Sequence, residues 1–117
     1  MRNDKDNLIF RLTFELAVDV IDFSELLREK KKFEMCSQIF RSGTSIGANT
    51  REAQNAESKR DFIHKFKIAA KEADELEYWF ELCEVSKFYP NPNEQMVKNL
   101  KSVILIISKI ISSSKNS

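Results

Sequence analysis

Apolar residues recur every three or four positions in four separate stretches of the chain. The first stretch, residues 8–29, has one such stripe: Ile9, Leu12, Leu16, Val20, Phe23 and Leu27. This spacing is typical of an amphipathic helix. A basic cluster from Arg28 to Lys32 follows, and cations are favoured near the C-terminus of a helix. We therefore expect a helix over residues 8–29 and a turn after it.

The second stretch, residues 33–54, differs from the others because small and polar residues interrupt it around Gly43 and Gly47. Glycine inside a helix costs about 1 kcal/mol relative to alanine. Two glycines in one helix therefore indicate either that another helix approaches closely or that this helix is broken.

The third stretch, residues 58–88, has the most regular pattern. Its apolar residues alternate four and three apart: Phe62, Phe66, Ala69, Ala73, Leu76, Phe80 and Cys83. Such a heptad seam is typical of antiparallel bundles. Ser58 is placed to cap this helix, with Asp61 three residues later, and Asn93 is placed to cap the next helix after Pro90 and Pro92.

The fourth stretch, residues 93–112, has two apolar stripes. The first consists of Val97, Leu100, Ile104, Ile107 and Ile111, and the second of Met96, Val103, Ile106 and Ile110. The second stripe either widens the buried face of the helix or forms a contact between subunits. For the second alternative the candidate interface residues are Val103, Ile106, Ile110 and Trp79, since a bulky aromatic residue can anchor an interface.

Together these stretches predict one all-α domain over residues 1–117, an antiparallel up-down-up-down four-helix bundle. The chain has only two glycines and two prolines, whereas sheet proteins need both in their turns. The connections between the expected helices are short, and short connections make neighbouring helices antiparallel.

The charges nearly cancel, with 19 Lys and Arg against 18 Asp and Glu, so the molecule as a whole has no field that attracts nucleic acid or an anionic membrane. The longest apolar run, Val103 to Ile107, is far shorter than the roughly 20 residues of a membrane span. Residues 1–7 lack the basic-then-apolar order of a secretory signal. We expect a cytoplasmic protein without a membrane partner.

Charge is unevenly distributed along the third stretch, whose first half is basic and second half acidic. In the expected topology the acidic half lies beside the turn with Arg28, Lys30, Lys31 and Lys32, which we call the lysine turn and which can offset the acidic charge. The other end of the bundle collects Arg51, Lys59, Arg60 and Lys65, the candidate nucleic-acid-binding residues. An ordinary solvated turn of mixed charge is the alternative interpretation.

The sequence lacks a pattern for catalysis or for a cofactor. His64 is the only histidine and is expected at the surface, while Cys36 and Cys83 are expected as reduced core residues. No Glu-x-x-His pair of a helical metal site is present, and Gly43 and Gly47 are not part of a phosphate-binding loop. We expect no metal, no cofactor and no enzymatic activity.

The segment from Met35 to Phe88 resembles the bacterial four-helix bundle proteins encoded by intervening sequences of 23S rRNA genes, a family that includes accessory proteins of diversity-generating retroelements. The resemblance is carried by Arg41 and small residues before Ser45-Ile46, by Asn49, by Arg51 to Ala53, by Phe62 and Phe66, by Ile68 to Ala70 and by Glu75 to Glu77. It implies a homopentamer of bundles arranged as a barrel. The retroelement members are strongly basic and bind nucleic acid and a reverse transcriptase, whereas this chain is nearly neutral.

The function expected from the sequence is a non-enzymatic homo-oligomer that engages structured RNA or a protein partner through one end of its barrel. The alternative is a pure protein-interaction scaffold, in which all exposed charge serves solubility and contacts between subunits. RNA binding would fall steeply with salt and would thereby separate the two.

Overall fold

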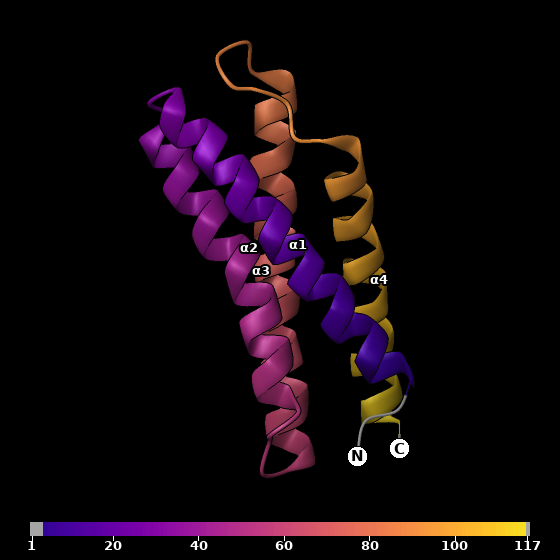
Figure 1. Ribbon diagram of the computed structural model, residues 1–117. Coiled ribbons are helices and arrows are strands. Elements are labelled where there is room, and N and C mark those ends of the chain that lie inside the picture. Colours follow the sequence, from indigo (N-terminus) through magenta and orange to yellow (C-terminus); the bar gives the residue numbers. More distant parts are fainter. Residues whose placement is uncertain (1–3, 117) are drawn as a thin grey trace.

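The computed structural model describes residues 4–116, whose four helices are joined by two short turns and by a longer loop between the third and the fourth helix (Figure 1). They are α1 (Asp4–Glu29), α2 (Phe33–Ala53), α3 (Lys59–Val85) and α4 (Glu94–Lys115). Successive helices run in opposite directions, so that the two ends of the chain lie at the same end of an elongated bundle (Figure 1). Each helix packs against two neighbours, in the cyclic order α1, α2, α3, α4 and back to α1. The predicted up-down-up-down fold is confirmed.

The core fills the space between the four helices, and each helix supplies one stripe to it. Across the bundle, the rings of Phe23 from α1 and Phe80 from α3 meet edge to face, with centroids 6.2 Å apart. The largest fully buried side chains include Phe66, Ile39 and Leu100. Cys36 and Cys83 are buried and free, as predicted. No helix within residues 4–116 is long and apolar enough to cross a membrane.

The predicted helix boundaries were close, and most of the differences have local causes. Ser58 and Asn93 lie just outside their helices because their side chains cap them, accepting hydrogen bonds of 3.0 Å from the backbone N–H of Asp61 and Met96. α3 ends three residues earlier than predicted because Ser86 is extended. α1 begins at residue 4 instead of 8, and α4 continues to 115 instead of 112.

The two glycines of α2 mark a close approach to α1, and the helix is not broken. A Cβ atom built on Gly43 would lie only 2.5 and 2.7 Å from the two methyl carbons of Val20. One built on Gly47 would lie 3.4 Å from the carbonyl oxygen of Thr13, which is ordinary contact. Only Gly43 is therefore required by the packing of α1 on α2.

The turn between α1 and α2 holds the only non-glycine residue with positive φ in the described part of the chain, Lys31 at 62°. The N–H of Lys32 donates to the carbonyl of Leu27 at 2.8 Å, and the N–H of Lys31 donates to that of Arg28 at 2.9 Å. This pair of bonds is a Schellman motif, which satisfies the last carbonyls of α1. A lysine thus occupies a position that usually favours glycine.

The second apolar stripe of α4 mainly widens the core of the chain itself. Val103 is fully buried and Ile110 is 7% exposed, so neither presents a surface to another molecule. Ile106 is half-buried, and Trp79 lies with Phe33 and Tyr89 around a hollow of about 560 Å³. Of the four candidate interface residues, Ile106 and Trp79 keep exposed surface, and their contact with another subunit remains a prediction.

Candidate nucleic-acid interface

The four basic residues predicted to bind nucleic acid lie at one end of the bundle, but they do not form one patch. Arg51 is in the last turn of α2, and its guanidinium group lies over the ring of Phe10, 5.7 Å from the centroid. The ammonium group of Lys65 donates a 2.8 Å hydrogen bond to the carboxylate of Glu52, which raises the pKa of Lys65. Arg51 and Lys65 are therefore both engaged by neighbouring helices of the same chain.

The other two predicted residues, Lys59 and Arg60, line a shallow hollow of about 500 Å³ on the outside of α3, together with Ile63, His64 and Lys67. Arg60, His64 and Lys67 are exposed and are spaced four and three residues apart, which places them on one face of the helix. Lys71 continues this face one turn further on. We call Arg60, His64, Lys67 and Lys71 the α3 cationic face.

Sequence reasoning missed His64 and Lys67 as members of this face. His64 was assigned correctly to the surface, but its position four residues after Arg60 and three before Lys67 was not used. The spacing of cations along α3 was the available signal.

Few acidic residues lie within the span of the α3 cationic face, although Glu57 precedes it and Glu72, Asp74 and Glu75 follow it. Asp61 is the only Asp or Glu between residues 59 and 71, and α4, which packs antiparallel to α3, has none between Gln95 and Asn116. Within the described residues, Arg60, Lys67 and Lys71 have no carboxylate within ion-pair distance. The face can therefore present positive charge to an anion.

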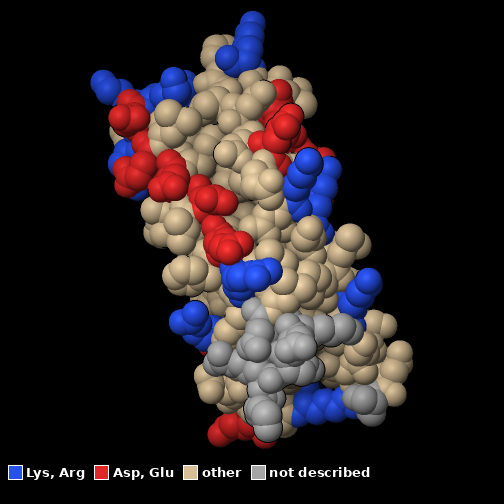
Figure 2. Space-filling view, turned by 45° about the vertical axis from the view of Figure 1, so that its right-hand side comes forward, with Lys and Arg blue, Asp and Glu red and all other residues tan. Residues whose placement is uncertain are grey.

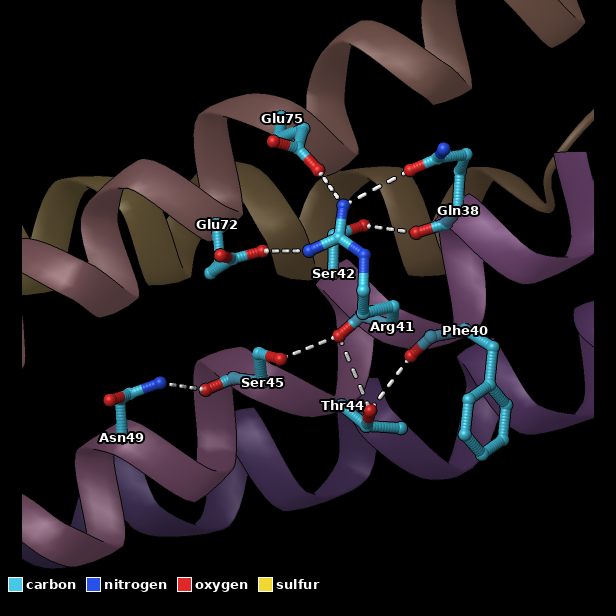
Figure 3. A network of polar contacts seen from close by, with 9 residues as sticks. All are labelled: Gln38, Phe40, Arg41, Ser42, Thr44, Ser45, Asn49, Glu72 and Glu75. Atoms are coloured by element: carbon cyan, nitrogen blue, oxygen red, sulfur yellow. Dashed lines mark hydrogen bonds and ion pairs between the residues drawn. The ribbon is translucent and has the colours of Figure 1, made fainter.

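The second half of α3 uses its charge differently, through Arg41 of α2 (Figure 3). The guanidinium group of Arg41 points between two carboxylates of α3, contacting Glu75 and lying 3.4 Å from Glu72, and it also donates to Gln38 at 3.0 Å. These interactions of the Arg41 guanidinium group, which we call the Arg41 fork, connect α2 to α3. They leave few of its N–H groups available to bind a phosphate. Arg41 and Glu75 belong to the motif that carries the family resemblance.

The small polar residues of that motif serve α2 itself. The hydroxyl groups of Ser42, Thr44 and Ser45 donate to carbonyls four residues earlier, at 2.8, 2.7 and 2.7 Å (Figure 3). The amide of Asn49 donates to the carbonyl of Ser45 at 2.9 Å. These bonds satisfy the side chains within the helix and do not converge on a ligand.

The offset of the acidic half of α3 by the lysine turn stays a prediction. The ion pairs of that half are made by Arg41, and no ion pair joins Lys30, Lys31 or Lys32 to α3 among the described residues. Lys32 instead lies over the ring of Tyr89, 5.9 Å from its centroid. Arg41 thus pairs with Glu72 and Glu75, which lie nearer the middle of α3 than the turn does.

The described residues contain no group of His, Cys, Asp and Glu side chains that could hold a metal ion. Burial, together with the charge of Glu84, raises the pKa of the Cys83 thiol to about 11, so this thiol stays protonated at neutral pH and is a poor nucleophile. The chemistry most accessible to this surface is electrostatic binding of an anion.

Two comparisons with known proteins agree with each other. The family model of the 23S rRNA-intervening sequence protein matches residues 5–113. A protein of unknown function from the S23 ribosomal protein family of Bacteroides thetaiotaomicron VPI-5482, whose crystal structure is known at 1.70 Å resolution, is 41% identical. The two structures superpose with a TM-score of 0.85 over 92% of this chain and 98% of the other. None of the curated proteins matches the sequence.

Proposed function

This chain belongs to the 23S rRNA-intervening sequence protein family, and we propose that it is a non-enzymatic, homo-oligomeric cytoplasmic protein that binds structured RNA through the α3 cationic face. The observation that carries this proposal is the placement of Arg60, His64 and Lys67 around one hollow, with Lys71 beside them and no carboxylate in ion-pair contact with the lysines or the arginine among the described residues. Phosphate groups are bound by clusters of this kind.

Repetition of the face in an oligomer would compensate for the small net charge of the chain. One copy offers three permanent cations, and each phosphate contact contributes little by itself. A ring of copies repeats the same cations around its axis, so that several weak contacts act on one RNA molecule. The pentamer implied by the family resemblance would provide such a ring.

Charge reversal on the two basic clusters tests this proposal. Arg60, Lys67 and Lys71 are changed together to glutamate in one variant, and Lys30, Lys31 and Lys32 in a second. Binding to a fluorescent fragment of structured 23S rRNA is measured by anisotropy at low salt. We expect the affinity of the first variant to fall roughly 100-fold or more and that of the second roughly threefold or less, since each phosphate that a cation neutralises adds separately to the affinity.

The nearly neutral net charge favours a second candidate function, a protein-interaction scaffold without RNA binding. In that case the wild-type protein does not bind the rRNA fragment even at low salt. An equal fall in affinity for the two variants would also contradict the proposal, because binding would then depend on total charge and not on the α3 cationic face.

A further inference from the structure

An apolar ridge runs along the outer side of α1. Phe14, Val18 and Ile21 are spaced four and three residues apart and are 59%, 44% and 41% exposed. Their spacing puts them in one line, which we call the α1 ridge. The neighbours of α1 in the chain are α2 and α4, and neither covers these side chains. Three large apolar side chains in a row in water indicate a contact surface.

Carboxylates border the α1 ridge. Glu15 and Asp22 are exposed and follow Phe14 and Ile21 directly, and Glu15 also forms an exposed ion pair of 4.0 Å with Arg11 one turn earlier. On the side that faces α4 stands Asp19, whose pKa is raised by burial and by the charges of Asp22 and Glu15. Figure 2 shows a diagonal row of acidic residues crossing the face of the molecule on the side where α1 lies. The α1 ridge therefore favours a partner that is apolar and carries positive charge.

The outer surface of α4 has this complementary character. Leu105 is 64% exposed and stands in a strip with Lys98, Lys101 and Lys109, seven and four residues before it and four after it. We call these four residues the α4 strip. No carboxylate lies within ion-pair distance of its lysines among the described residues. Lys98 also lines a polar hollow with Glu15 and Asp19 of the same chain, so Lys101 and Lys109 are the lysines best placed for another molecule.

We infer that a second copy of this chain docks its α4 strip against the α1 ridge. The inference rests on the homo-oligomer of the proposed function and names the surfaces that form it. Pairing two α1 ridges antiparallel about Val18 would place Glu15 of each copy beside Asp22 of the other, and like charges repel. Pairing two α4 strips would bring lysines together. The mixed pair is the arrangement in which apolar residues meet apolar residues and opposite charges border them.

A contact between two different surfaces is heterologous. It repeats from copy to copy and closes into a ring when the rotation allows. The α3 cationic face takes no part in it, so a ring built this way keeps that face available for RNA. The contact and the RNA site can therefore be disrupted separately.

The test reverses charge on each surface in turn and measures mass by analytical ultracentrifugation. One variant changes Glu15 and Asp22 to lysine, and the other changes Lys101 and Lys109 to glutamate. At a concentration where the wild type has several times the 13.6 kDa mass of one chain, we expect each variant alone to associate at least tenfold more weakly. An equimolar mixture of the two should associate more strongly than either variant alone, because each variant then carries the charge that the other needs, although alternating variants close a ring only with an even number of copies. A chain with all four substitutions should recover the mass of the wild type.

The matched control changes Glu81 and Glu84, two exposed carboxylates of α3, to lysine and should keep the mass of the wild type. Circular dichroism verifies that each variant is folded. The inference is overturned if the single-surface variants keep their mass, if the mixture stays dissociated, or if the wild type is a monomer. RNA binding that depends on Arg60, Lys67 and Lys71 would survive the first two outcomes, and its absence in a protein that still associates would overturn the proposed function alone.

Discussion

The middle of α2 and the first half of α3 are both rich in polar and charged residues, but they use them in opposite ways. In α2, Arg41 is held by Gln38 and by two carboxylates of α3, and the hydroxyl groups around it bond to their own helix. In α3, the side chains of Arg60, His64 and Lys67 have no hydrogen-bond or ion-pair partner among the side chains that the structure describes, residues 8–116. The polar residues in the middle of α2 connect helices of the bundle, whereas those in the first half of α3 face the solvent.

This difference shows that the partner of a charge, and not the charge itself, indicates its role. A cation whose field is cancelled by neighbouring carboxylates contributes to packing and little to recognition. A cation with no such neighbour adds to the potential that an approaching anion meets. Measurements of stability and of binding should therefore respond to different residues in the two regions.

The largest effect on stability is expected in α2, at Gly43. Gly43→Ala brings a Cβ atom against Val20, a stiff β-branched residue that is fully buried. The overpacking should lower the free energy of unfolding by about 2 kcal/mol, measured by urea denaturation, in spite of the better helix propensity of alanine. Gly47→Ala is the control, because a Cβ atom fits there, and it should be neutral or raise the free energy of unfolding by up to about 1 kcal/mol. Equal effects at the two positions would contradict the close approach at Gly43.

The fork at Arg41 should give the next largest effect. Arg41→Ala leaves Glu72 and Glu75 without their cation, and we expect the free energy of unfolding to fall by about 1 kcal/mol, because the group is half exposed. Lys67→Ala, on the α3 cationic face, should change it by less than about 0.5 kcal/mol. RNA binding should respond the other way round, weakening for Lys67→Ala and changing little for Arg41→Ala. A comparable drop in stability at Lys67 would mean that the α3 cationic face is also part of the packing.

The smallest effect on stability is expected in the lysine turn, where a substitution should raise the free energy of unfolding. Lys31 has the left-handed backbone conformation that closes α1, which costs a residue with a side chain roughly 1 kcal/mol. Lys31→Gly should therefore raise the free energy of unfolding, by up to about 1 kcal/mol after the greater flexibility of the unfolded chain is counted. RNA binding should not change. Destabilisation by this glycine would show that the Lys31 side chain has a role that the backbone does not reveal.

Most of the fold could be predicted from the chain, because the signals are local. Apolar stripes marked the four helices, and Ser58 and Asn93 marked two of their starts. The turn after α1 was predicted, but its Schellman geometry was not, because the usual residue there is glycine and a lysine occupies the position. The different roles of Gly43 and Gly47 depend on which residue of α1 faces each, and spacing within α2 does not give that.

The candidate site could be predicted in part. Lys59 and Arg60 were assigned to the correct end of the bundle and line the hollow on α3. Arg51 and Lys65 were grouped with them because they are near in sequence, but Phe10 of α1 and Glu52 of α2 engage them. Those interactions follow from the arrangement of three helices, which a single sequence does not specify. His64 and Lys67 could have been found from their helical spacing.

The salt dependence of RNA affinity tests most directly whether the α3 cationic face binds phosphate. The logarithm of the binding constant for the rRNA fragment is plotted against the logarithm of salt concentration for the wild type and for the variant with Arg60, Lys67 and Lys71 changed to alanine. We expect a steep negative slope for the wild type and a flatter one for the variant, by roughly 0.7 to 0.9 for each phosphate that the variant no longer neutralises. Parallel slopes for the two proteins would mean that the α3 cationic face does not bind phosphate.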